Sequence, residues 1–486
     1  MPDRHDRHND DVDSWLSGRI DPLPPPPGTF ELIKRRARRR KYRRLAITAG
    51  AAAVIVAAGI TVPQVVSLSP LGPVNASGRN APVPSPGGTA TGTGGGGPLA
   101  SSAASAQPTV PPPVPPNFQP TSVTFVSTSI GWVIGQAGTP GHCATRYCTS
   151  VARTDNAGKT WFGVPAPLTG APSGATGVGG IRFLNGIDGW AFGPQLFATH
   201  DRGHTWTQVN TDGLRVTDLE TVGDRAFAVF ASCTGSGPAF AAQCTTFTLY
   251  SSPAGADDWT PVGASTSGLT TGTAGSASIV LTGSTGYLLG PGGMLYSGPV
   301  DGSAAWSQVA RVPCAVGTAQ PDGLPSGALL GAIDASNLII ACLQQAGMPG
   351  GQQQKVIYSS ANGGASWQQV ATAPTAGVAS SVAASPSQAV ILGTNEGIDV
   401  LASGGTSWQQ ATLLSGSPRA SGAAGASGAP GAPVAVAGGF QYVGMTTDEQ
   451  GIALPADATD GVVWFTFDGG AHWQPSPVSS PEVSGS

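Results

Sequence analysis

One eight-residue pattern, Ser/Thr-x-Asp/Asn-x-Gly-x-x-Trp, recurs along this 486-residue chain and constrains its fold more than any other feature. Four copies are clear, and three weaker copies keep the turn residues and the tryptophan. Successive tryptophans of the seven copies lie 41 to 65 residues apart, about the length of a four-stranded propeller blade with its loops. The pattern residues are Asn156, Gly158, Trp161, Asp201, Gly203, Trp206, Asn362, Gly364, Trp367, Asp468, Gly470 and Trp473 in the clear copies, and Trp259, Asp301, Trp306, Gly405 and Trp408 in the weaker ones.

A second repeat lies upstream of several of these tryptophans. It joins a short run of β-branched and aromatic residues to a Gly-Trp or Gly-Tyr step, whose aromatic residues are Trp132, Trp190 and Tyr287. Short runs rich in Val, Ile, Phe and Thr and punctuated by glycine are typical of strands. Together the two repeats predict an all-β fold, a β-propeller of seven four-stranded blades over residues 118–480.

The pattern resembles the Asp-box, or BNR, repeat of sialidases, sortilin-type receptors and photosystem II assembly factors of the Ycf48 type. Its pairing with the upstream Gly-Trp step is most similar to the Ycf48-like group. Physically, an Asp or Asn side chain in such a turn accepts bonds from nearby backbone N–H groups, and glycine takes a positive φ. The tryptophan is expected to pack between blades. The resemblance also implies that these turns lie on the outer part of the blades, away from an active face.

The catalytic set of a sialidase-like glycoside hydrolase, an alternative function that the resemblance raises, is not recognisable. The Arg-Ile-Pro signature of that family is absent, and Ile181-Arg182-Phe183 is a poor substitute for it. The adjacent carboxylates Asp257-Asp258 and Asp448-Glu449 are expected to be solvated, because neighbours in a strand point to opposite faces and loop pairs face water. We therefore predict no catalytic residues, no metal site and no cofactor.

An apolar segment near the N-terminus predicts a membrane anchor. The uncharged run from Leu45 to Val62 would span about 27 Å as a helix, close to a hydrocarbon core of about 30 Å. Nine cations crowd residues 33–44 and no matching cluster follows, so the positive-inside rule places the N-terminus in the cytoplasm. We predict a basic, mostly disordered tail over 1–44, a transmembrane helix over 45–66, a Pro/Gly/Ser/Thr-rich linker over 67–117 and an extracytoplasmic propeller. A cleaved signal peptide is the alternative, and it would export the same domain.

Six cysteines fall in three local pairs beyond the apolar run. An even count in an oxidising compartment favours disulfides, and local pairing closes the shortest loops at the lowest entropy cost. The predicted bonds join Cys143 to Cys148, Cys233 to Cys244, and Cys314 to Cys342.

Charge excludes one class of partner. Residues 45–486 carry 11 Lys or Arg against 20 Asp or Glu, which argues against nucleic acid, because phosphate binding needs clustered cations. We expect a non-catalytic binding, scaffold or assembly module that meets a protein or glycan at the cell surface. A Ycf48-like assembly factor for a membrane complex is a further alternative. Binding is expected at the loops around one end of the central channel.

Overall fold

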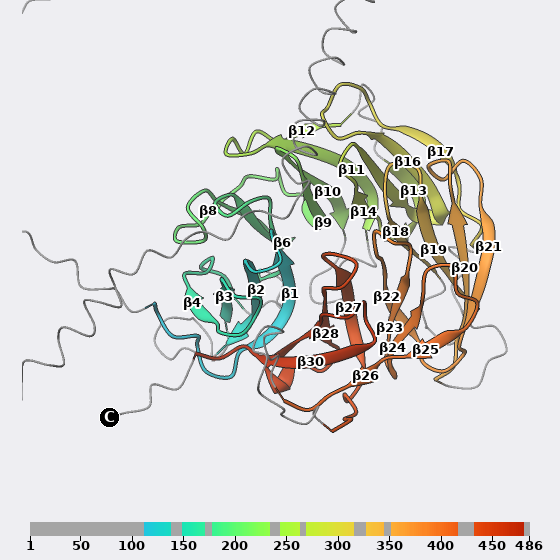
Figure 1. Cartoon of the computed structure of the whole chain (residues 1–486). Helices are drawn as coiled ribbons and strands as arrows, with labels where there is room; N and C mark the ends of the chain where they lie inside the picture. The colour runs from blue at the N-terminus through green and yellow to red at the C-terminus, as the bar shows by residue number, and fades with distance from the viewer. Residues whose placement is uncertain are drawn as a thin grey trace, which may run out of the picture. The chain divides into compact units, whose positions relative to one another are not determined.

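The protein is described by a computed structural model over residues 111–137, 148–170, 177–233, 244–262, 269–314, 327–344, 351–416 and 432–480. Within these ranges it forms thirty β-strands in seven sheets, with two short 3-10 turns, η2 (Pro291–Gly293) and η3 (Ala458–Asp460). The sheets follow one another along the chain and are arranged around a common centre, from β1 in cyan to β30 in red (Figure 1). The predicted all-β, seven-bladed propeller is confirmed.

Each blade is an antiparallel meander, and the first strand of each blade lies nearest the ring centre (Figure 1). The first four blades comprise β1 (Gln119–Phe125), β2 (Gly131–Ala137), β3 (Cys148–Thr154) and β4 (Phe162–Val164); β5 (Val178–Phe183), β6 (Gly189–Pro194), β7 (Leu196–Thr199) and β8 (Thr207–Gln208); β9 (Arg215–Val222), β10 (Arg225–Cys233), β11 (Cys244–Pro253) and β12 (Thr260–Pro261); and β14 (Ser278–Leu281), β15 (Thr285–Gly290), β16 (Met294–Pro299) and β17 (Ser307–Arg311). The last three comprise β18 (Gly327–Ala332), β19 (Leu338–Gln344), β20 (Gln354–Ser360) and β21 (Gln368–Ala373); β22 (Ala379–Ala384), β23 (Val390–Thr394), β24 (Gly397–Leu401) and β25 (Trp408–Gln410); and β27 (Phe440–Met445), β28 (Gly451–Pro455), β29 (Val462–Thr466) and β30 (His472–Pro477).

Two sheets depart from the expected four strands. β13 (Leu269–Gly275) pairs with β11 in the third blade. β26 (Thr412–Leu413) runs parallel to β30 at the outer edge of the seventh blade. The other five sheets have four strands each among the described residues, as predicted.

The upstream sequence repeat occupies the first two strands of its blades. In blade 1, Phe125 ends β1 directly opposite Gly131, the first residue of β2. A Cβ atom on Gly131 would stand 2.6 Å from the Phe125 ring, so the ring covers a backbone that has no side chain. Phe183 lies over Gly189 in the same way in blade 2. The glycine before each tryptophan therefore makes room for the aromatic ring of the strand before it.

Hydrophobic clusters fill the seven interfaces between neighbouring blades. The tryptophan of each pattern copy packs at the interface of its own blade with the preceding one, as the sequence predicted. These residues, in blade order, are Trp161, Trp206, Trp259, Trp306, Trp367, Trp408 and Trp473.

The ring closes by packing of blade 7 against blade 1, without a blade that is shared between the two chain ends. All four strands of blade 1 come from residues 119–164, a manner of closure that the sequence did not predict. Trp161 lies in one cluster with Phe465 of blade 7 and donates from its Nε1 to Ser476 Oγ at 3.0 Å. The segment 111–118 adds to this seam. Val114 and Phe118 are buried in the same cluster, and Val114 N donates to Ser480 Oγ at 2.6 Å.

Two of the three predicted disulfides are present, Cys233–Cys244 and Cys314–Cys342. Cys148 is also disulfide-bonded, but Cys143 lies outside the described residues, so the third pair stays a prediction.

The predicted tail over 1–44, the span over 45–66 and all but the last residues of the linker over 67–117 also lie outside the described ranges and stay predictions. In the part of the chain that the structure describes, no helix is long and apolar enough to cross a membrane.

Candidate functional site

The four clear copies of the pattern form the same turn, built around a buried hydroxyl. In blade 1, Thr154 Oγ1 accepts a hydrogen bond from Gly158 N at 3.0 Å and donates one to Asn156 Oδ1 at 3.0 Å. Asn156 Oδ1 also accepts from Thr160 N at 2.9 Å. The equivalent hydroxyls of the other clear copies, which make the same bonds, belong to Thr199, Ser360 and Thr466.

Each pattern residue in these copies therefore has a structural task. The Asp or Asn caps the turn, and the glycines adopt φ values of 76° to 96°, as in Gly158 and Gly470. The Ser or Thr at the first position was not among the site residues predicted from sequence, although it is buried and bonds to both the glycine N–H and the Asp or Asn side chain. The pattern residues are spread over all blades and do not converge on one pocket.

The weaker copies keep the position of the turn but not its full set of bonds. In blade 4, Ser303 N donates to Asp301 Oδ1 at 2.9 Å, and Trp306 Nε1 donates to Pro299 O at 3.2 Å. Nε1 of Trp259 and of Trp408 finds no hydrogen-bond partner among the described residues, but neither does Nε1 of Trp367 in a clear copy. The weaker copies therefore differ in the polar bonds of the turn and not in the bonding of the tryptophan.

Each pattern turn except that of blade 6 is bonded to the turn that joins the first two strands of its blade. Arg202 N donates to Ile187 O at 3.0 Å in blade 2, and the same kind of backbone bond recurs in blades 1, 3, 4, 5 and 7. Both sets of turns therefore lie at one end of the blades. We call this end the acidic rim, which comprises residues 126–130, 155–161, 184–188, 200–206, 223–224, 254–259, 282–284, 300–306, 333–337, 361–367, 385–389, 402–407, 446–450 and 467–471.

The acidic rim carries almost all of the net charge of the described residues. It holds eleven Asp or Glu against Lys159 and Arg202, whereas the remaining described residues have seven acids and six Lys or Arg. Hydrogen bonds keep several of these carboxylates ionised. The pKa of Asp301 is lowered by its bond from Ser303, and the pKa of Asp334 is lowered by its bond from Asn337. The carboxylates are Asp155, Asp188, Asp201, Asp224, Asp257, Asp258, Asp301, Asp334, Asp448, Glu449 and Asp468.

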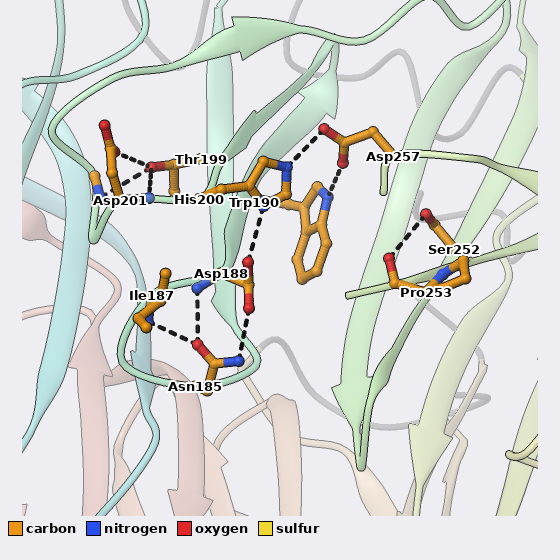
Figure 2. A network of polar contacts seen from close by, with 11 residues as sticks. Asn185, Ile187, Asp188, Trp190, Thr199, His200, Asp201, Ser252, Pro253 and Asp257 are labelled. Atoms are coloured by element: carbon orange, nitrogen blue, oxygen red, sulfur yellow. Dashed lines mark hydrogen bonds and ion pairs between the residues drawn. The ribbon is translucent and has the colours of Figure 1, made fainter. Parts of the chain in front are cut away.

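A polar network ties blade 2 to blade 3 on this rim. Figure 2 shows the His200 ring between two carboxylates, with Nδ1 2.9 Å from Asp188 Oδ1 and Nε2 2.9 Å from Asp257 Oδ2. The other oxygen of Asp257 accepts from Trp190 Nε1 at 3.0 Å. Partial burial lowers the pKa of His200, but the two carboxylates raise it more, so that its net shift is upward. Asp257 is thus bound to blade 2 rather than solvated, unlike the expectation from sequence.

A cavity of about 340 Å³ lies in the channel at the rim end of the innermost strands. Its walls come from blades 1, 2, 3 and 7, and include Thr124, Arg182, Glu220, Tyr442 and Met445. We call it the channel pocket. It lies at the acidic rim because its lining residues in β1, β5 and β27 are those next to the first turn of each blade.

An ion pair forms one wall of the channel pocket. Arg182 Nε donates to Glu220 Oε1 at 2.9 Å, while Nη1 donates to Ile181 O at 2.8 Å and to Ser122 Oγ at 3.2 Å. Burial lowers the pKa of Arg182, but the charges of Glu220, Tyr442 and Asp218 raise it above its ordinary value.

Asp218 adds a second carboxylate two residues before Glu220. Burial and the charge of Glu220 raise the pKa of Asp218 to about 6, although its Oδ2 accepts a bond from Ile279 N at 2.7 Å. The cluster of Arg182, Glu220 and Asp218 therefore places two carboxyl groups beside one guanidinium.

Sequence reasoning missed this pocket, although a signal exists. Thr124, Arg182 and Glu220 occupy the same position in consecutive blades, each opposite the aromatic residue of the second strand. Their partners are Trp132, Trp190 and Phe227. Aligning the first strands by the Gly-Trp step would have matched Thr124 with Arg182, whereas blade 3 has Ala226-Phe227 at that step and gives no such signal for Glu220.

The described residues offer few alternatives to the channel pocket as a binding site. They contain no group of three or more His, Cys, Asp or Glu side chains placed to hold a metal ion. A larger open cavity of about 540 Å³ is lined by Gln195, Asn210 and Arg215 among others. Its walls come from one stretch from the end of β6 to the start of β9 and not from several blades. The channel pocket, which four blades build, is the stronger candidate.

No protein-family model matches the chain, and no curated protein matches it. Among solved structures, YCF48 bound to D1 peptide matches at 14% identity with a TM-score of 0.44, covering 74% of this chain and 95% of that one. YCF48 from Cyanidioschyzon merolae matches at 15% identity with a TM-score of 0.41, covering 66% and 90%. An ancestral GH74 enzyme matches at 14% identity with a TM-score of 0.47; the match covers 75% of this chain but only 47% of that enzyme. Likeness at these identities concerns the fold alone.

Proposed function

We propose that the chain is a membrane-anchored, extracytoplasmic recognition module that binds its partner at the acidic rim and does not catalyse a reaction. The observation that carries the proposal is the channel pocket, where side chains of blades 1, 2, 3 and 7 meet at the end of the propeller that bears the charge. Loops and pockets on a rigid scaffold are where binding residues concentrate.

The sialidase-like alternative meets a specific difficulty in the pocket. Arg182 is the one arginine among the described lining residues, and its Nε is committed to Glu220. A substrate carboxylate would have to compete with that ion pair and would lie close to the charge of Asp218. Tyr442 also lines the pocket, but burial raises the pKa of its hydroxyl, as does the charge of Glu220, and this disfavours the ionised, nucleophilic form.

The test uses the full chain purified in detergent as bait against extracts of the source membrane and wall, in parallel with a panel of sialosides and other glycosides. We expect retention of a protein partner and no turnover. Thr446→Trp, which would fill the pocket without changing its charge, should weaken that retention, whereas Arg311→Ala, which alters a strand outside the rim, should not. Glycoside turnover that Arg182→Ala abolishes would refute the proposal in favour of the hydrolase.

The anchor requires its own test. Protease shaving of intact cells, followed by membrane fractionation, should remove the propeller and leave a short protected fragment that contains the basic tail. Release of a soluble, N-terminally trimmed chain would indicate the cleaved signal peptide instead.

A further inference from the structure

We propose that the channel pocket receives a lysine or arginine side chain from a basic segment of a partner protein, which the acidic rim attracts. This inference rests on the proposed recognition function and adds the chemistry of the partner. It depends on three features of the described residues: the shape and lining of the pocket, the charge of the groups in and behind it, and the charge of the rim around it.

The lining suits a side chain with an apolar stem and a cationic head. Phe125, Phe183 and Met445 offer apolar surface, and Glu220 offers a carboxylate that is partly exposed. Oε1 of Glu220 bonds to Arg182, while Oε2 makes no hydrogen bond within the described residues. Lysine and arginine bury their methylene stems along apolar surface and keep the charged group at a polar one. A volume of about 340 Å³ is near the lower end of ligand sites, which favours one side chain over a large ligand.

The charges at the pocket favour a cation over an anion. The one lining arginine, Arg182, already donates to Glu220, Ser122 and Ile181 O. Behind the ion pair, Asp218 is a second carboxylate, so two carboxylates stand beside one guanidinium, and burial together with the charge of Glu220 raises the pKa of Asp218. An entering cation would be attracted to the carboxylates, whereas an entering anion would be repelled by them.

The acidic rim extends the same preference over a wide surface. Its formal charge is −9, and Asp224, Asp258 and Glu449 are exposed there without a side-chain hydrogen bond to a described residue. Surface charge of one sign speeds the association of an oppositely charged partner and makes it sensitive to salt. A partner with several cations would be drawn to the rim, and one of its side chains would enter the pocket.

The test titrates the full chain in detergent with three fluorescent peptides of equal length, one Lys/Arg-rich, one Glu-rich and one of Gly and Ser, at ionic strengths of about 50 and about 300 mM. We expect the basic peptide to bind more tightly than the other two, and to bind more weakly at the higher ionic strength. Glu220→Gln should reduce its affinity at least about tenfold, whereas the matched control Glu396→Gln, between β23 and β24 at the other end of the blades, should leave it unchanged.

Two further variants and one matched control separate the effects of the pocket and the rim from a damaged fold. Thr446→Lys places a cation in the pocket without removing the ion pair, and it should abolish binding of the basic peptide. The triple variant Asp224→Asn, Asp258→Asn and Glu449→Gln should weaken binding and its salt dependence together. The matched triple variant Asp212→Asn, Asp457→Asn and Asp460→Asn changes acids outside the rim and should bind as the wild type does.

The outcomes distinguish this inference from the proposed function. Equal affinity for the basic and Gly/Ser peptides, or full binding by both Glu220→Gln and Thr446→Lys, would overturn the cation inference. If spermidine displaced the basic peptide with the same affinity as the peptide itself, the ligand of the pocket would be a small amine and not a protein segment. That result would also overturn the cation inference. Retention of an acidic or neutral protein partner would leave the recognition function standing while the inference falls.

Discussion

Replacement of Thr154 by valine tests whether the buried hydroxyl organises the turn. Valine has nearly the shape of threonine, but it leaves Gly158 N, a buried donor, without its acceptor at 3.0 Å. An unsatisfied buried group costs about 1–3 kcal/mol. Each kcal/mol lowers Tm by roughly 2–4 °C in a domain of about 150–250 residues and by less in a larger one, so Tm should fall by at most about 12 °C. Guanidinium and thermal unfolding followed by tryptophan fluorescence measure the change.

Thr160→Val is the matched control, because that hydroxyl is exposed and bonds only to Asn156 Nδ2 among the described residues. Its effect should stay within about 0.5 kcal/mol. Combining Thr154→Val with Asn156→Ala should cost less than the sum of the single changes, because the two side chains share a hydrogen bond. Equal destabilisation by Thr154→Val and Thr160→Val, or strict additivity with Asn156→Ala, would refute the role of the hydroxyl.

Three further outcomes follow from groups elsewhere in the ring, and a fourth from the cysteine outside the described residues. His200→Gln should lower the free energy of unfolding by about 0.5–1 kcal/mol near pH 5.5 and leave it unchanged near pH 9. A raised pKa gives a stabilisation that is present below the ordinary pKa of histidine and is lost as pH rises through the pKa of the folded state. Equal losses at both pH values would contradict this. Asp218→Asn should be more favourable to stability at pH 8 than at pH 4 by roughly 1–3 kcal/mol, because a folded pKa of about 6 makes the ionised carboxyl increasingly costly as pH rises from 3.8 through 6. The backbone bond that the amide cannot accept costs the same at both pH values, so an effect on the urea midpoint that does not change with pH would refute the prediction. Lys355→Met should cost about 2–4 kcal/mol in urea unfolding, because the buried Nζ donates to three backbone carbonyls, and a neutral effect would mean that the ammonium is dispensable. Non-reducing peptide mapping should find Cys143 joined to Cys148, and free thiols at both would show that prediction to be wrong.

The architecture was predictable because the sequence repeats it. Trp161 and its six counterparts recur at blade spacing, and each one packs against the preceding blade, so periodicity alone fixed the number of sheets. The added strands β13 and β26 were not predictable, because they lie in connections where no copy of the pattern gives a register. Pairing at an outer edge depends on which neighbouring backbone is unpaired, and that is a property of the assembled ring.

The candidate site was less accessible from sequence, for a related reason. Arg182 and Glu220 are 38 residues apart and Tyr442 is more than two hundred residues further on, so only closure of the ring brings them to one cavity. The sequence shows the net charge of the chain, but it does not show where in the folded ring the charged side chains lie. Carboxylates that are scattered along the sequence collect on one rim because two turns of every blade point the same way.

Ring closure also fixes where the polypeptide enters relative to that rim. The carbonyl oxygen of Phe118 lies 2.8 Å from where a Cβ atom of Gly461 would stand, and Gly461 belongs to the connection from β28 to β29. That connection is at the end of blade 7 opposite the turns of the acidic rim, since successive turns of a meander alternate between its two ends. The segment 111–118 therefore joins the ring on the face away from the channel pocket. The bond from Val114 N to Ser480 Oγ joins the two ends of the described ring on that face, opposite the acidic rim.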